Sequence, residues 1–236
     1  MLTIAQVLIA RRDPPIGFEN PSPEPVVFGK GNEPLRYVVL GDSTAAGQGA
    51  DYEDGIAMRS ARHLSRHYRV SLINFSVSGA KVADVVDEQL SKAVQARPDL
   101  VLLSVGANDV TSLTNPKNVK NDLGKIIDEL IAGSCDVKIV ITGAPDMGSI
   151  PRFAQPLRYL AGLSTKRLNN KILPLAREKN ITIAPIAEET GPVFRQKPEL
   201  FSEDKFHPDA SGYEVWSKTI NPALDEALVN QLSNCK

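Results

Sequence analysis

A serine, a histidine and an aspartate in this sequence are placed so that they could form a nucleophile and its base. Ser43 follows Gly41-Asp42 directly after an apolar run, and Asp204 precedes His207 by three residues, within reach of its imidazole. A serine hydroxyl is a poor nucleophile unless a base removes its proton and a third group orients that base. We therefore predict Ser43 as nucleophile, His207 as base and Asp204 as the orienting acid, with Asp209 as the nearest alternative acid.

Attack of a hydroxyl on a carbonyl group also needs hydrogen-bond donors for the oxyanion that forms. The sequence offers three such donors, the Ser43 N–H, the Gly79 N–H and the side-chain amide of Asn108. Glycine at position 79 has no Cβ that would keep a substrate away from its N–H group. We predict that these three donors form an oxyanion hole.

The elements that must position these residues are indicated by the apolar pattern after Leu35. Short runs rich in Val, Ile and Leu are mostly continuous, as in strands buried on both faces, and they alternate with stretches of helical spacing. This alternation predicts right-handed crossovers and a three-layer α/β/α sandwich with a parallel five-stranded sheet. The predicted strands are 37–40, 70–77, 100–105, 137–142 and 181–186, and the predicted helices are 56–68, 82–96, 119–132, 157–179 and 213–232. Pro222 is expected to kink or interrupt the last helix.

Polar segments follow the predicted strands at the edge where open α/β sheets bind ligands. Each segment alone has a simpler interpretation: a turn at a strand exit for Gly41-Asp42-Ser43, a helix-capping turn for Asn108-Asp109 and a hydrogen-bonded histidine for His207. Their order along the chain and their common position favour a single site. The segments after strands are Gly41-Asp42-Ser43, Ser78-Gly79, Gly106-Ala107-Asn108-Asp109 and Gly143-Ala144-Pro145-Asp146. Asp204-Lys205-Phe206-His207 instead leads into the last predicted helix.

Four sequence blocks together resemble those of the SGNH (GDSL-type) hydrolases. The blocks are residues 39–43, 74–79, 106–109 and 204–207, and the resemblance spans about residues 36–220. It implies a flavodoxin-like fold, with the roles predicted above for the Ser43, His207 and Asp204 side chains and the same oxyanion hole. Thr44 stands where the signature often has leucine, at a position that varies and leaves the chemistry unchanged. Residues 143–148 and 167–169 are similar to small bacterial esterases of this group.

The resemblance implies a serine esterase that hydrolyses small-molecule carboxylic esters, with short acyl chains, through an acyl-enzyme on Ser43. It implies no metal and no organic cofactor. An acyltransferase or a carbohydrate deacetylase would use the same residues and differ in what intercepts the acyl-enzyme. A ligand-binding module of the same fold is the alternative outside enzymes, and the intact Ser43, Asp204 and His207 argue against it.

Composition and spacing argue against several other classes. The chain has 236 residues, and 27 Lys and Arg balance 28 Asp and Glu, so no nucleic-acid partner is expected. The two cysteines lie far apart in the sequence, unlike paired metal ligands. His63 and His67 have the spacing of two ligands but no third, and a solvated helix face explains them better. Residues 41–49 lack the lysine of a phosphate-binding loop.

Residues 1–34 are predicted to form a proline-rich N-terminal arm that precedes the hydrolase domain, residues 35–236. The arm begins with an apolar decapeptide that is too short to cross a bilayer and is followed by two arginines. This stretch indicates either a short amphipathic helix on the domain or the trimmed remnant of a membrane anchor. The first reading fits a cytoplasmic protein and the second a membrane-tethered or extracytoplasmic one. The sequence does not indicate an oligomeric state.

Overall fold

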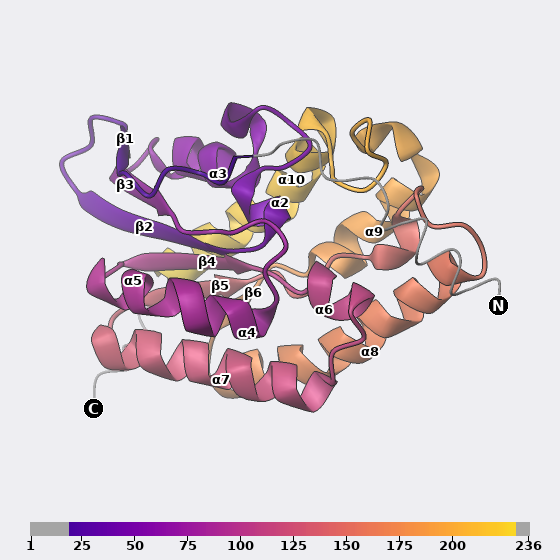
Figure 1. The fold of residues 1–236 in the computed structure, drawn as a ribbon. Helices are drawn as coiled ribbons and strands as arrows, with labels where there is room; N and C mark the ends of the chain where they lie inside the picture. The colour runs from indigo at the N-terminus through magenta and orange to yellow at the C-terminus, as the bar shows by residue number, and fades with distance from the viewer. Residues whose placement is uncertain (1–18, 230–236) are drawn as a thin grey trace.

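A six-stranded sheet forms the centre of the computed structural model, which describes residues 19–229 (Figure 1). Its strands are β1 (Val26–Phe28), β2 (Pro34–Gly41), β3 (Arg69–Asn74), β4 (Leu100–Ser104), β5 (Lys138–Ile141) and β6 (Thr182–Ile183). They lie in the order β1-β3-β2-β4-β5-β6, and all neighbours are parallel except β1 and β3. The five expected strands are therefore present, in the flavodoxin-like order, with β1 added at one edge.

Helices cover both faces of this sheet. Figure 1 shows α3 and α10 on one face and α5, α7 and α8 on the other, so the expected three-layer sandwich is confirmed. The helices are α2 (Ser43–Ala46), α3 (Ile56–Leu64), α4 (Val82–Asp84), α5 (Leu90–Gln95), α6 (Ala107–Thr111), α7 (Pro116–Gly133), α8 (Leu157–Glu178), α9 (Ile186–Gln196) and α10 (Ala210–Val229). Three short 3-10 turns are η1 (Tyr52–Asp54), η3 (Met147–Ser149) and η4 (Pro198–Leu200), and the π-helical turn η2 (Val85–Gln89) joins α4 to α5.

Helix α7 illustrates how local sequence determines these elements. The Asn115 side chain caps its first turn by accepting the Lys117 N–H at 3.0 Å, and Pro116 occupies the first helical position, where no N–H is needed. Apolar residues at positions 119, 123, 126, 127 and 130 then fall on one face. All five are buried, so this face packs into the core against the sheet.

Three features differ from the pattern expected from the sequence. The predicted helix 82–96 is divided by the π-helical turn, and the predicted strand 181–186 is only two residues long because α9 begins at Ile186. Helix α10 is not interrupted at Pro222 and continues to Val229. Its buried residues lie on both sides of Pro222, from Tyr213 to Ala227, so tertiary packing holds the helix together through the proline.

The described part of the N-terminal arm, residues 19–33, belongs to the sheet through β1, which pairs antiparallel with β3. The apolar decapeptide considered as a helix or an anchor remnant lies outside the described residues. No helix within residues 19–229 combines the length and apolar character needed to span a membrane.

The end of β2 is fixed by an unusually close backbone approach at Gly41. Its φ is +147°, and a Cβ at this position would lie 1.9 Å from the Ser104 carbonyl oxygen. The buried Gln89 side chain accepts the Gly41 N–H at 2.9 Å and donates to the Gly41 carbonyl at 2.8 Å. The strand end that leads into Ser43 is therefore held in one position.

Replacing Gly41 by alanine should lower the free energy of unfolding by about 3 kcal/mol or more, because the new Cβ collides with backbone that cannot move freely. Urea denaturation measures this change. Gly124→Ala in α7 is the matched control, since a Cβ there meets only Leu175 at an ordinary 3.6 Å and alanine favours the helix. Equal unfolding free energies for the two variants would contradict the constraint at Gly41.

Candidate active site

The structure brings the Ser43, His207 and Asp204 side chains into one chain of hydrogen bonds. Ser43 is the first residue of α2, and its Oγ lies 2.9 Å from His207 Nε2. His207 Nδ1 lies 2.5 Å from Asp204 Oδ2. Asp209, the alternative acid, instead accepts the Gly212 N–H at the start of α10. The arrangement predicted for the nucleophile, its base and the orienting acid is thus present in space.

Asp204 is held in its ionised form by several donors. Burial alone would raise the pKa of Asp204, but hydrogen bonds from the His207 side chain and backbone and from the Phe206 N–H hold it well below its ordinary value. Its Oδ1 accepts from Ser202 Oγ, Phe206 N and His207 N at 2.8 to 2.9 Å. An ionised carboxylate can only accept, so His207 Nδ1 carries the proton. His207 Nε2 therefore accepts, and Ser43 Oγ donates to it.

Two of the three predicted oxyanion donors are backbone N–H groups without an internal acceptor. Among residues 19–229, no carbonyl or side chain accepts the Ser43 N–H or the Gly79 N–H. Gly79 is exposed and has a φ of +85°, and a Cβ there would meet no atom within 4 Å. Glycine at this position is therefore explained by the left-handed backbone, while the space beside it stays open.

Asn108, the third predicted donor, and its neighbour Asp109 connect α6 to the segment after β3. Asn108 Nδ2 donates to the Ala80 carbonyl at 3.0 Å, and Asp109 Oδ2 accepts the Val82 N–H at 3.0 Å. Burial raises the pKa of Asp109. The two side chains thus fix the loop that carries Gly79 against the loop that carries Asn108.

Asp42 forms the turn that begins α2. Its Oδ1 accepts from the Thr44 N–H at 2.9 Å and from the Thr44 hydroxyl at 2.7 Å. The turn at the strand exit, given above as the simpler interpretation of Gly41-Asp42-Ser43, is therefore present and is compatible with a site at Ser43. The side chain is fully buried, its Oδ2 has no hydrogen-bond partner in the described chain, and burial raises its pKa.

Several polar residues that hold the site were not predicted from the sequence. Gln48 N–H donates to the Ser43 carbonyl at 2.9 Å, and Gln48 Oε1 accepts the Ser78 hydroxyl at 2.7 Å. The buried Tyr213 hydroxyl donates to the Gln48 carbonyl at 2.5 Å. Gln48 thereby links the nucleophile loop, the Gly79 loop and α10. Only its position five residues after Ser43 could have indicated a role.

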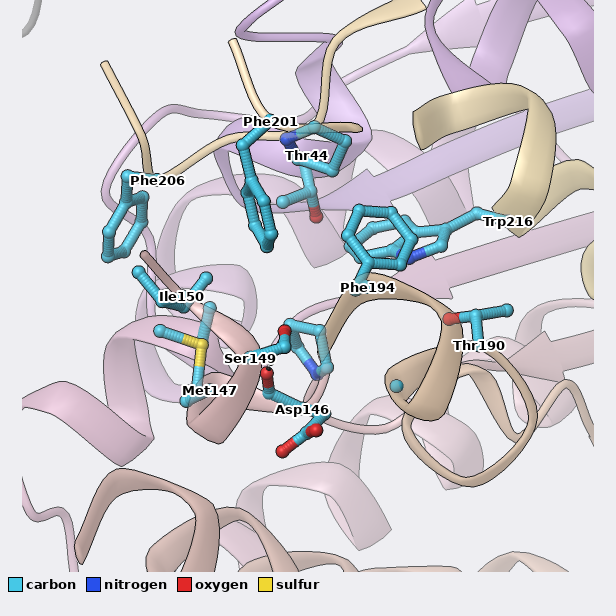
Figure 2. A pocket seen from close by; sticks show the side chains of 14 residues that line it. Thr44, Asp146, Met147, Ser149, Ile150, Thr190, Phe194, Phe201, Phe206 and Trp216 are labelled. Atoms are coloured by element: carbon cyan, nitrogen blue, oxygen red, sulfur yellow. Dashed lines mark hydrogen bonds between the residues drawn. The ribbon is translucent and has the colours of Figure 1, made fainter. Parts of the chain in front are cut away.

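A small apolar cavity lies beside this group of residues. Its lining includes Thr44, Ala107, Phe206 and Pro208, each next in sequence to Ser43, Asn108 or His207. Figure 2 shows aromatic and aliphatic side chains around it, with the ring of Phe194 close to Trp216. The other lining residues include Met147, Ile150, Thr190 and Phe201.

His63 lies in α3, whereas His67 lies in the turn after the helix ends at Leu64, so the two do not share a helix face as metal ligands would. His63 Nε2 contacts both carboxylate oxygens of Asp225 in α10, at 2.9 and 2.8 Å. Between residues 19 and 229 no cluster of three His, Cys, Asp or Glu side chains could hold a metal ion.

Comparisons with known proteins give a consistent family. Residues 39–215 match the GDSL-like Lipase/Acylhydrolase family. The GDSL-like esterase Rv1075c of Mycobacterium tuberculosis (strain ATCC 25618 / H37Rv) is 29% identical, over 98% of this chain and 78% of that protein. An arylesterase of Vibrio mimicus is 27% identical, over 73% of this chain and 80% of that protein.

Solved structures share the fold. TesA has a TM-score of 0.67 at 20% identity, covering 81% of this chain and 99% of that chain. The psychrotrophic esterase EstA from Pseudoalteromonas sp. has a TM-score of 0.64 at 18% identity, covering 83% and 100%. The predicted flavodoxin-like α/β sandwich is therefore confirmed.

The lowered pKa of Asp204 predicts how this residue contributes to stability at acid pH. An unfolded aspartate titrates at about 3.9, so between that pH and the lower folded pKa the unfolded chain binds more protons. The stability that Asp204 contributes is therefore present above about pH 4 and is lost as the pH falls further. The difference in unfolding free energy between the native chain and Asp204→Asn should shrink from pH 5 to pH 2.5. A constant difference, or the same shrinkage in the control Asp209→Asn, would contradict this.

Proposed function

The chain belongs to the GDSL-like lipase/acylhydrolase family and is a serine esterase, and on this basis we propose that Ser43, His207 and Asp204 are its catalytic triad. The observation that carries the proposal is the continuous hydrogen-bond chain from Ser43 Oγ through His207 to Asp204. The Ser43 N–H, at the end of this chain, and the Gly79 N–H have no acceptor in the described chain. The carbonyl carbon of the substrate ester then lies within reach of Ser43 Oγ, and its carbonyl oxygen lies within reach of the two N–H groups.

In the first half of the reaction, His207 Nε2 takes the proton of Ser43 as Oγ attacks the ester carbonyl carbon. The carbonyl oxygen becomes an oxyanion and accepts hydrogen bonds from Ser43 N, Gly79 N and Asn108 Nδ2. Collapse of the tetrahedral adduct breaks the bond to the alcohol, and the imidazolium of His207 donates its proton to the leaving oxygen. The acyl group is then bound to Ser43 as an ester.

In the second half, water replaces the alcohol and His207 takes one proton from it. The resulting hydroxide attacks the acyl carbon, a second oxyanion forms in the same place, and its collapse releases the carboxylic acid. The proton on His207 returns to Ser43 Oγ. Asp204 remains ionised throughout and stabilises the imidazolium that forms in each half.

The apolar cavity is proposed to bind the acyl chain of the substrate. It is lined by residues next in sequence to Ser43, Asn108 and His207. Most of its lining residues are apolar, and the polar ones are Thr44, Asp146, Ser149 and Thr190. The aromatic side chains of Phe194, Phe201 and Trp216 are buried and bound it on one side (Figure 2). A cavity this small accepts a short acyl chain, and a longer chain requires side chains to move.

Replacing Ser43 by alanine should reduce kcat by at least 10⁴-fold while the fold is retained, because no other group can form the acyl-enzyme. p-Nitrophenyl acetate hydrolysis measures the loss. A fluorophosphonate should label the native chain once, at Ser43, and should not label Ser43→Ala. Ser65→Ala, at a half-buried serine in the turn after α3, is the control and should keep full activity. A loss below about a hundredfold in Ser43→Ala would overturn the nucleophile.

Shortening Ile150 should extend the range of acyl chains that are accepted. Ile150→Ala removes three carbons from the cavity wall, and each buried methylene of a substrate is worth about 0.8 kcal/mol. The ratio of kcat/KM for p-nitrophenyl hexanoate over acetate should rise about tenfold or more. Ile127→Ala, in the core side of α7, is the matched control and should leave this ratio unchanged. An unchanged ratio in Ile150→Ala would place the acyl chain elsewhere.

A further inference from the structure

The N-terminal arm approaches the oxyanion segment along the edge of the sheet. Strand β1 pairs with β3 in a register that sets Val26 opposite Leu72 and Phe28 opposite Val70. In an antiparallel pair, each step back along one strand is a step forward along the other. The same register continued for six residues sets Asn20 opposite Ser78. In the structure, Asn20 Oδ1 accepts the Ser78 N–H at 2.8 Å.

The arm makes this contact with a side chain because every second residue of its backbone there has no N–H group to donate. Residues 21, 23 and 25 are prolines, which have no N–H and are incompatible with a regular ladder. No backbone hydrogen bond joins residues 20–25 to residues 73–78 within the described chain. Asn20 therefore supplies the acceptor that a partner strand would otherwise have supplied.

The N–H groups from Phe75 to Ser78 show why this acceptor matters. Phe75 and Val77 donate to carbonyls of β2, at Val39 and Gly41, and Ser76 donates to the nearby Asn74 side chain. These three donors are held by the sheet and by the segment itself. Ser78 is the last residue before Gly79, and its N–H is held only by the arm.

We infer that Asn20 is a positioning residue, which fixes the Ser78 backbone and thereby aims the Gly79 N–H at the oxyanion. The inference rests on the proposed function, because it takes Gly79 as an oxyanion donor. Ser78 is held at two points, its N–H by Asn20 and its hydroxyl by Gln48. The Gly79 N–H follows directly and has no acceptor of its own in residues 19–229, so its direction depends on the bonds that hold its neighbours. On the far side of Gly79, the Ala80 N–H donates to the Val77 carbonyl and the Ala80 carbonyl accepts from Asn108, while on the near side the two bonds of Ser78 fix the chain. Gly79 also has a left-handed φ, and no packed side chain restrains it.

The test compares kcat and KM in Asn20→Ala with those of the native full-length chain, using p-nitrophenyl acetate. The substitution removes one exposed hydrogen bond, so kcat should fall about 3- to 10-fold. KM should stay within twofold, because the oxyanion exists mainly in the transition state. Asn20→Asp keeps an acceptor for the Ser78 N–H and should recover most of the loss. Ser22→Ala is the matched control in the same arm, since Ser22 Oγ accepts only from the Glu24 N–H. It should leave both constants unchanged.

A second measurement follows the chemical shift of the Gly79 amide proton. In the diethyl phosphoryl adduct of Ser43, a tetrahedral mimic, the Gly79 amide proton should resonate downfield in the native chain. The shift should diminish in Asn20→Ala and return in Asn20→Asp. Asn108→Ala is measured in parallel and should lose about 10²- to 10³-fold in kcat. Native kcat and an unchanged Gly79 shift in Asn20→Ala, with the loss in Asn108→Ala intact, would overturn the role of Asn20 alone. Full activity in both Ser43→Ala and Asn108→Ala would overturn the proposed function and this inference with it.

Discussion

The absence of a side chain at Gly41 determines how closely the ends of β2 and β4 can approach. The Ser104 carbonyl fills the space that a Cβ would need, and it accepts the Asp42 N–H at 3.2 Å. The chain must then turn at once into α2, which brings Ser43 to the carboxyl edge with its N–H directed out of the sheet's hydrogen-bond network. A bulkier residue would separate the strands and move the Ser43 hydroxyl away from His207. The catalytic geometry thus begins as a packing constraint between two strand ends.

Polar side chains convert this packing into a fixed site. The Gln89 side chain bonds both the N–H and the carbonyl of Gly41. Gln48 connects the Ser43 carbonyl to the Ser78 hydroxyl, and the Asn108 side chain donates to the Ala80 carbonyl. Every one of these contacts joins segments that follow different strands or lie far apart in sequence. Buried polar groups need partners, so the loops cannot shift independently without leaving donors or acceptors unsatisfied. The Ser43 and Gly79 N–H groups, which have no acceptor within residues 19–229, are the ones proposed to face the substrate.

The sequence predicts the parts of the molecule that depend on local pattern. Continuous apolar runs predicted the five parallel strands. The segments after strands indicated Ser43, Gly79 and Asn108, and the segment before the last helix indicated His207. Strand β1 was missed because three residues between prolines have no periodicity of their own, and their pairing with β3 is visible only in space. Gln48 and Gln89 were missed for the same reason: their side chains bond to groups far away in the sequence, the Ser78 hydroxyl and the Gly41 backbone. The interruption considered at Pro222 does not occur, because buried residues on both sides keep α10 continuous.

The hydrogen bond between Ser43 and His207 joins residues 164 positions apart. The nucleophile and both loops with oxyanion donors lie in the first half of the chain, whereas the base and its acid come just before the last helix. During synthesis, a nascent chain therefore exposes Ser43 long before any base can activate it, and a free serine hydroxyl is unreactive toward esters. Ester hydrolysis begins only after the ribosome has released the segment that carries His207 and α10 has packed against α3. With the proposed roles, enzymatic activity would therefore report that the segment from Ser43 to α10 has folded.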